Sequence, residues 1–198
     1  MKGVSIKYIP DFFTIYNLDC CITGNTLFLG DEFVGSVSLM RLLSKIDKPT
    51  SGQVLVDDKN LQEIKDKDLP FCYIPIEPYL LNKSVEENLM LPLKIRKINK
   101  TEAKNRVNSL INKYNLQNFP QKIKEMSSSE KKIVCLVRAL VRNAKYVLLE
   151  HFFDNLDAKH LPLASQILRE LEKTSTIIAC EKLLHKHFEN YKQIELHN

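Results

Sequence analysis

Hydrophobic and polar residues follow two different patterns along the chain. Short apolar runs rich in β-branched residues predict strands, whereas stretches with apolar residues three or four positions apart predict helices. Strands are expected at residues 4–9, 26–29, 54–56, 72–74, 146–149, 176–179 and 193–196. Helices are expected at residues 39–46, from residue 84, and at residues 101–114, 127–143 and 161–171, with a turn at residues 49–52. A short helix before the last strand completes the pattern.

The alternation of strands and helices predicts an α/β fold around a largely parallel sheet. The run at residues 146–149 is apolar throughout, as expected of a strand covered on both faces. We expect one domain over residues 1–198, with a helical subdomain at about residues 79–143 inserted into it. Two helix starts carry a serine followed three residues later by a glutamate, which predicts capping boxes at Ser84 and Ser127.

Length and composition are those of an ordinary globular domain. The 198 residues, 44% of them hydrophobic, are enough to bury a core. No run approaches the roughly 18 apolar residues of a membrane span, and residues 1–5 lack the start of a signal peptide, so a cytoplasmic location is expected. The formal charge of +5 comes from lysines spread along the chain, which argues against a nucleic-acid partner.

Cysteine and glycine usage narrows the kind of site to expect. The five cysteines form no CxxC pair, so no metal site is expected, and their scattered apolar surroundings predict buried thiols. The chain has only 5 glycines, against about 7% of residues in average proteins. Glycine lets backbone N–H groups approach an anion, so a chain this poor in glycine has few phosphate-binding loops to offer.

Two of the glycines nevertheless have the spacing of a phosphate-binding loop. Gly30 and Gly35 match the pattern G-x-x-x-x-G-K-[ST] between a predicted strand and a predicted helix. Ser36 stands in the place of the lysine that pairs with the phosphates, and Val37 in that of the hydroxyl that holds Mg²⁺. Ser38 offers a hydroxyl one residue out of register. Two acidic residues of the loop would repel phosphate, namely Asp31 and Glu32. The alternative interpretation is a plain strand–turn–helix.

The order of motifs over residues 4–196 resembles that of the ATP-binding-cassette (ABC) ATPases. The stretch Lys48-Pro-Thr-Ser-Gly-Gln-Val-Leu-Val-Asp57 is nearly identical to the family's sequence after the phosphate-binding loop. This resemblance implies a P-loop-NTPase-like fold, with a mostly parallel sheet, flanking helices, an N-terminal antiparallel strand region and a helical subdomain. The chain ends soon after its last predicted strand, so a regulatory tail of the kind found in the family is not expected.

At the positions that are catalytic in the family, this chain has other residue types. The glutamine that reaches Mg²⁺ falls on Ile76, and the switch histidine that contacts the γ-phosphate falls on Glu181. Glu150 replaces the aspartate that orients the metal, and His151 replaces the glutamate that activates water, although a histidine can act as a general base. Tyr8 lies near the position of the adenine-stacking aromatic residue, where simple packing is the alternative.

Two further motifs belong to the dimer interface in this family. The signature Leu-Ser-Gly-Gly-Gln is represented by Met126 followed by Ser127, Ser128, Ser129 and Glu130. Ser127 matches the family's serine, whereas serines stand in the places of both glycines. The alternative interpretation is that the capping box alone explains this helix start, without any role in phosphate binding. The D-loop sequence is retained as Asn155-Leu156-Asp157.

The resemblance and the replacements together favour a non-catalytic ABC-type subunit that needs no cofactor. We expect it to pair with itself or with another ABC ATPase subunit, and to dock an integral membrane permease through residues 73–93, at the inner face of the membrane. Two alternatives stay open. One is a low-activity ATPase that binds ATP and Mg²⁺ and uses Glu150 and His151. The other is a stand-alone regulatory binding protein.

Overall fold

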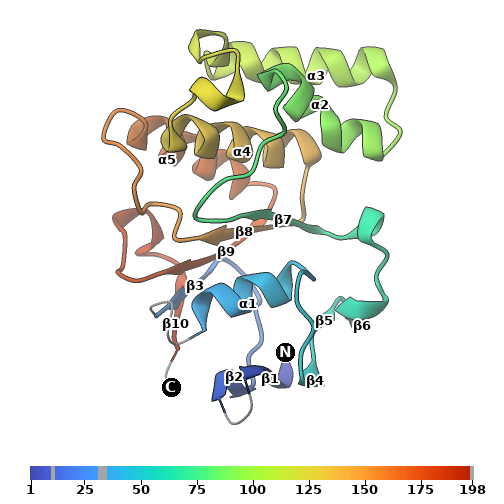
Figure 1. The fold of residues 1–198 in the computed structure, drawn as a ribbon, viewed down its shortest axis with the longest axis vertical. Helices are drawn as coiled ribbons and strands as arrows, with labels where there is room; N and C mark the ends of the chain where they lie inside the picture. Colours follow the sequence, from blue (N-terminus) through green and yellow to red (C-terminus); the bar gives the residue numbers. More distant parts are fainter. Residues whose placement is uncertain (10–11, 31–34, 197–198) are drawn as a thin grey trace. The chain divides into compact units, whose positions relative to one another are not determined.

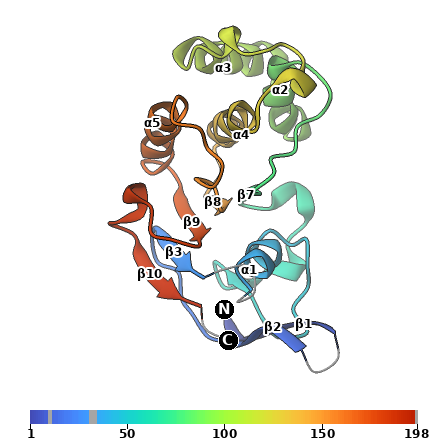
Figure 2. The same cartoon turned by 60° about the vertical axis from the view of Figure 1, so that its left-hand side comes forward.

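The computed structural model describes residues 1–9, 12–30 and 35–196. The chain forms two compact units. Unit 1 consists of Met1–Tyr73, Tyr146–His151 and Thr176–Asn198, and unit 2 consists of Ile74–Lys145 and Phe152–Ser175. Figures 1 and 2 show the course of the chain through the strands of unit 1 and the helices of unit 2.

A five-stranded sheet forms the centre of unit 1, with the strand order β10-β3-β9-β8-β7. The pairs β10–β3, β3–β9 and β9–β8 are parallel. These strands are β3 (Thr26–Leu29), β7 (Phe71–Ile74), β8 (Tyr146–Glu150), β9 (Thr176–Glu181) and β10 (Lys192–Glu195). The structure therefore confirms the predicted α/β fold with a mostly parallel sheet.

A second, antiparallel sheet in unit 1 has the strand order β2-β1-β4. Its strands are β1 (Lys2–Ile9), β2 (Phe12–Leu18) and β4 (Ser51–Gln53). The sequence prediction of a turn at residues 49–52 was wrong for Ser51 and Gly52, because β4 pairs with β1. All three residues of β4 are exposed, so no apolar pattern marks this strand. A small hairpin follows, formed by β5 (Leu55–Val56) and β6 (Lys59–Asn60).

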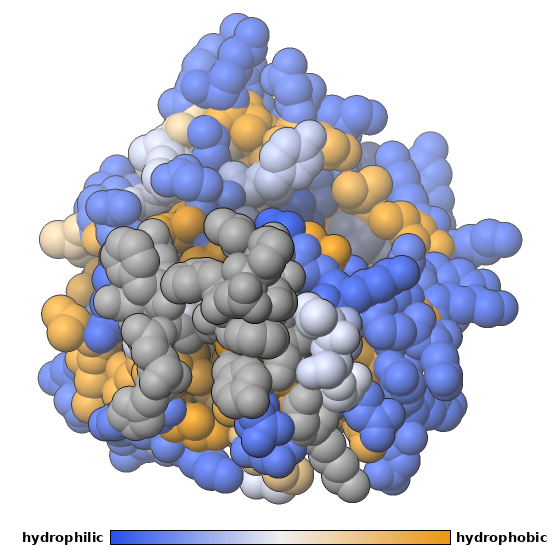
Figure 3. Space-filling view, turned by 60° about the horizontal axis from the view of Figure 1, so that its bottom comes forward, coloured by the Kyte–Doolittle hydropathy of each residue, from blue (hydrophilic) through white to orange (hydrophobic). Residues whose placement is uncertain are grey.

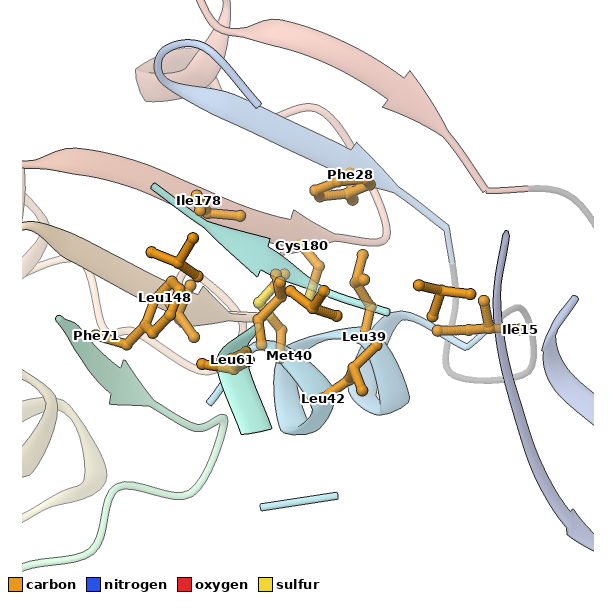
Figure 4. Close-up of a cluster of buried hydrophobic side chains, with 14 residues drawn as sticks. Ile15, Phe28, Leu39, Met40, Leu42, Leu61, Phe71, Leu148, Ile178 and Cys180 are labelled. Carbon is orange, nitrogen blue, oxygen red and sulfur yellow. The ribbon is translucent and has the colours of Figure 1, made fainter. Parts of the chain in front are cut away.

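Helix α1 (Ser36–Leu43) contacts β8 and β9 and supplies one side of the core of unit 1. Figure 4 shows Leu39, Met40 and Leu42 of this helix next to side chains of the sheet, among them Phe28, Leu148, Ile178 and Cys180. The prediction that all cysteines are buried was wrong for Cys20 and Cys21. Both follow β2 in a surface segment, where Cys20 is half-buried and Cys21 exposed.

Unit 2 is built from four helices: α2 (Val85–Ile95), α3 (Lys100–Lys113), α4 (Ser128–Arg142) and α5 (Leu161–Leu171). Helix α4 contacts the other three, which explains why its apolar residues are buried around most of its circumference. Both predicted capping boxes are present: the Glu87 N–H donates to Ser84 Oγ at 3.1 Å, and the Glu130 N–H donates to Ser127 Oγ at 3.1 Å.

Short 3₁₀ turns connect the main elements: η2 (Leu61–Glu63), η3 (Asp66–Asp68), η4 (Leu116–Asn118), η5 (Ile123–Glu125) and η6 (Lys186–Phe188). Within the described ranges, no helix has both the length and the apolar character needed to cross a membrane. Hydrophilic residues cover most of the described surface in Figure 3, and apolar residues form smaller groups between them.

Candidate functional site

The carboxyl ends of β3, β8 and β9 meet at one edge of the sheet in unit 1. The strand register brings Leu29 opposite Glu181 and Glu150 opposite Cys180. Beyond these pairs the backbones remain linked, since the Gly30 N–H donates to the Glu181 carbonyl at 3.1 Å and the His151 N–H donates to the Cys180 carbonyl at 2.9 Å. Three predicted site positions, those of Gly30, His151 and Glu181, therefore lie at this edge.

The predicted phosphate-binding loop joins this edge to helix α1. Gly35 precedes the helix with a φ of 86°, a left-handed conformation that glycine adopts without steric cost. Ser36, Val37 and Ser38 form the first turn of the helix, where Ser36 and Ser38 are buried. Asp31 and Glu32 lie outside the described residues.

Ser36 and His151 share a hydrogen bond inside unit 1. The Ser36 Oγ lies 3.3 Å from His151 Nε2, and both residues have 0% exposure. His151 directly follows β8 and has a φ of 42°. Its imidazole ring lies next to Ser36 at the start of α1. A ring nitrogen of His151 also lies within 4.8 Å of a carboxylate oxygen of Glu181. The serine predicted to stand in the lysine position and the histidine predicted to stand in the glutamate position are therefore hydrogen-bonded to each other.

Glu150 is bonded to a residue that the sequence did not suggest. The Tyr73 hydroxyl donates to Glu150 Oε2, and Glu150 is only 3% exposed. Burial raises the pKa of the Tyr73 phenol well above its ordinary value, and the hydrogen bond and charge of Glu150 raise it further. Tyr73 is therefore a neutral donor that compensates a carboxylate taken out of water.

The signature and D-loop positions come together in unit 2. The Asp157 N–H donates to Ser129 Oγ at 3.0 Å, so the serine in a glycine position of the signature contacts the D-loop backbone. The Asp157 carboxylate in turn accepts a hydrogen bond from the His160 N–H at 2.9 Å and lies 2.7 Å from His160 Nδ1. The slight desolvation of the exposed Asp157 carboxylate acts to raise its pKa, but the hydrogen bonds with Ser129 and His160 outweigh it and hold the pKa below its ordinary value.

Lys132 is the second residue that sequence reasoning missed. It has 0% exposure, and its ammonium donates to the carbonyls of Phe152, at 2.8 Å, and Asp154. The ammonium also lies 5.6 Å from the centre of the Phe152 ring. A lysine inside the apolar pattern of helix α4 is the sequence signal for this contact, because a buried ammonium requires acceptors. Lys132 and Ser129 together attach the segment before and at the D-loop to helix α4.

The remaining predicted positions are less informative. Ile76 is half-buried in the segment of unit 2 between β7 and α2. Asn155 has a φ of 57°, which asparagine tolerates better than most residues. The Tyr8 side chain lies outside the described part of the chain.

The family model for ABC transporters matches residues 17–151. Among curated proteins, the chain is similar to the spermidine/putrescine import ATP-binding protein PotA of Thermotoga maritima, with 30% identity over 177 residues that cover 87% of this chain and 47% of that protein. It is also similar to the Fe(3+) ions import ATP-binding protein FbpC of Vibrio cholerae, with 29% identity over 164 residues that cover 80% of this chain and 46% of that protein. The chain thus spans about half the length of the curated relatives it matches.

Among solved structures, the fold is similar to that of an ATP-binding cassette determined as a dimer in a post-hydrolysis state with ADP and Pi. The TM-score is 0.81 at 19% sequence identity, and the match covers 98% of this chain and 92% of the other. At that identity the likeness concerns the fold alone, whereas the family model covers more than half of the chain. The chain therefore belongs to the ABC transporter family, as a homologue of its ATP-binding subunits.

Proposed function

We propose that this chain is a non-catalytic member of its family, which pairs with itself or with an active ABC ATPase subunit and docks a membrane permease. The observation that carries the proposal is the pair of internal hydrogen bonds in unit 1, Ser36 with His151 and Tyr73 with Glu150. Each bond joins a residue that stands in a catalytic position of the family to another residue of the same protein.

The side chains present do not fit Mg²⁺ and ATP. Phosphoryl transfer depends on positive charge and metal coordination around the phosphates. Ser36 is neutral where the family has a lysine, and Val37 has no atom able to bind a metal. Glu181 adds a buried carboxylate at the edge where the phosphates would lie, with 2% exposure. Each lost group of this kind costs on the order of 10²-fold in rate or more, so the combined loss argues against hydrolysis.

The contacts of unit 2 support a role in association. Lys132 and Ser129 fix the backbone around the D-loop, which is the interface segment in dimers of this family. This fixation uses only groups of the protein itself, so it does not depend on a bound nucleotide. Exposed apolar side chains of the same unit, including Tyr79 at 72% and Ile95 at 58% exposure, offer a surface for a permease. Such a partner would hold the chain at the inner face of the membrane.

His151 gives the one specific reason to keep an alternative. Its imidazole follows β8, where the family has the residue that activates water, and it already bonds a hydroxyl. A low-activity ATPase would use His151 as the base and Glu150 to orient the metal. That alternative predicts that ATP raises the melting temperature, and that His151→Ala removes ATP turnover.

Calorimetric titration of the purified chain with ATP, with and without Mg²⁺, tests the proposal. An active ABC ATP-binding subunit measured in the same buffer serves as the positive control. We expect no binding at millimolar ATP, and no phosphate release above a blank without protein. Binding that requires Mg²⁺, together with turnover that Glu150→Gln abolishes, would refute the non-catalytic assignment.

A further inference from the structure

Unit 1 contains a cavity of about 910 Å³ at the amino ends of the sheet strands. Phe71 and Tyr146, the first residues of β7 and β8, line it together with Leu43, the last residue of α1. The other described lining residues are Met1, residues 19–22 after β2, residues 54–58 at the hairpin β5–β6, and Ile178 of β9. Parallel strands put their carboxyl ends, and with them His151, at the other edge. The cavity is therefore separate from the candidate nucleotide site.

Aromatic and aliphatic side chains make up part of the lining of this cavity. The rings of Phe71 and Tyr146 stack with centroids 5.1 Å apart and an angle of 29° between their planes. Phe71 and Ile178, both labelled in Figure 4, belong to the core of unit 1 and also line the cavity. Burial raises the pKa of the lining Cys20 thiol, so this side chain stays uncharged at neutral pH. This part of the lining thus suits an apolar or aromatic group.

The lining also carries three carboxylates, on the exposed residues Asp19, Asp57 and Asp58. Among the lining residues that the structure describes, the amino group of Met1 is the only basic group, and it donates to the Cys20 carbonyl at 2.7 Å. Outside the lining, the Lys192 ammonium contacts the Cys21 carbonyl at 3.5 Å. On the described residues that line the cavity, negative charge therefore exceeds positive charge, which favours a cationic ligand.

Two of these carboxylates are held at the tip of the hairpin β5–β6. Val56 pairs with Lys59, so Asp57 and Asp58 form a two-residue loop. Their φ values are 51° and 62°, as the tight hairpin turn with two left-handed residues requires. Asparagine favours the same turn at least as well as aspartate. The charges can therefore be removed by Asp→Asn substitution without changing the shape of the hairpin.

We propose that this cavity binds an organic cation with an aromatic or apolar body. Its volume falls in the range of about 300 to 1,000 Å³ that is typical of small-molecule sites. Aromatic rings attract cations, and the stacked rings of Phe71 and Tyr146 line the same cavity as the hairpin carboxylates of Asp57 and Asp58. Binding at this place would let a small molecule act on the chain independently of a nucleotide.

Fluorescence titration of the purified chain with berberine, a planar aromatic cation whose emission rises in apolar surroundings, tests this inference. The anionic dye 1-anilinonaphthalene-8-sulfonate is the probe control. The test variant is Asp57→Asn with Asp58→Asn, and the matched control is Asp68→Asn, an exposed carboxylate of unit 1 outside the cavity lining. Far-UV circular dichroism and the melting temperature establish that each variant is folded.

We expect saturable binding of berberine that is tighter than binding of the anionic dye. The double variant should bind berberine roughly threefold to tenfold more weakly, the effect of two partly screened charges, and Asp68→Asn should bind like the unchanged protein. Three results would overturn the inference: no saturable signal with berberine, equal affinity of the folded double variant, or equal affinity for the anionic dye. Because no nucleotide is present, these results leave the proposal of a non-catalytic subunit untouched.

Discussion

Tyr73→Phe is the sharpest perturbation of the candidate site, because it removes one oxygen and leaves the aromatic ring in place. Glu150, only 3% exposed, would then lose the hydroxyl that donates to its carboxylate. A hydrogen bond to a charged group contributes about 1.5–3 kcal/mol, and we expect a loss of that size in the free energy of unfolding at pH 7. Urea denaturation followed by circular dichroism measures this loss.

A double-mutant cycle with Glu150→Gln separates this bond from other effects of the substitution. Glutamine keeps an acceptor but carries no charge, so Tyr73→Phe should cost only about 0.5–1.5 kcal/mol in the Glu150→Gln background. The difference between the two backgrounds is the coupling of the phenol with the carboxylate charge. Equal costs in both backgrounds, or costs below about 0.5 kcal/mol in both, would refute the reasoning that Tyr73 compensates a buried charge.

The same substitution has a pH signature. In the folded protein the pKa of the Tyr73 phenol is raised above the ordinary tyrosine value of 10.0, first by burial and then by Glu150. The unfolded chain therefore ionises first, so the contribution of Tyr73 is complete below pH 10 and is lost as the pH rises toward the folded pKa. From pH 9 to pH 11, the unchanged protein should lose more stability than Tyr73→Phe. Parallel curves for the two proteins would contradict the assignment, since Tyr114, whose pKa is also raised, is present in both.

Two further predictions concern unit 2. Lys132→Met should remove the ammonium that donates to the carbonyls of Phe152 and Asp154, and so lower the free energy of unfolding by roughly 1–3 kcal/mol. Amide hydrogen exchange in residues 152–157 should become faster in this variant but not in the control Lys131→Met. Unchanged exchange in that segment would show that Lys132 does not position it. Ser127→Ala should cost about 1 kcal/mol of unfolding free energy because it removes the N-cap of α4. The Ser128 hydroxyl finds no hydrogen-bond partner among the described residues, so Ser128→Ala should be neutral or slightly stabilising. Equal effects of the two substitutions in thermal or urea denaturation would argue against the capping box.

The sequence alone predicted those helices, strands and caps that depend on residues close together in the chain. The apolar run at residues 146–149 and the helical periodicity of residues 161–171 correspond to β8 and α5, because burial depends on a face of one element. The capping boxes at Ser84 and Ser127 were predictable for the same reason, since donor and acceptor lie three residues apart. The interpretation that Ser36 stands in place of a lysine and His151 in place of a catalytic glutamate also came from the sequence alone, because motif spacing is a property of the chain.

Only the tertiary structure decided which of these residues contact each other. Tyr73 and Glu150 are 77 positions apart, and Lys132 and Phe152 are 20 apart, so no local pattern connects either pair. Strand β4 was missed because its exposed residues gain strand structure only by pairing with β1. The sequence thus determined which residue types stand at the predicted site positions. The fold decided that Ser36 is hydrogen-bonded to His151 and Glu150 to Tyr73, because buried polar atoms pair with groups of the elements that lie next to them.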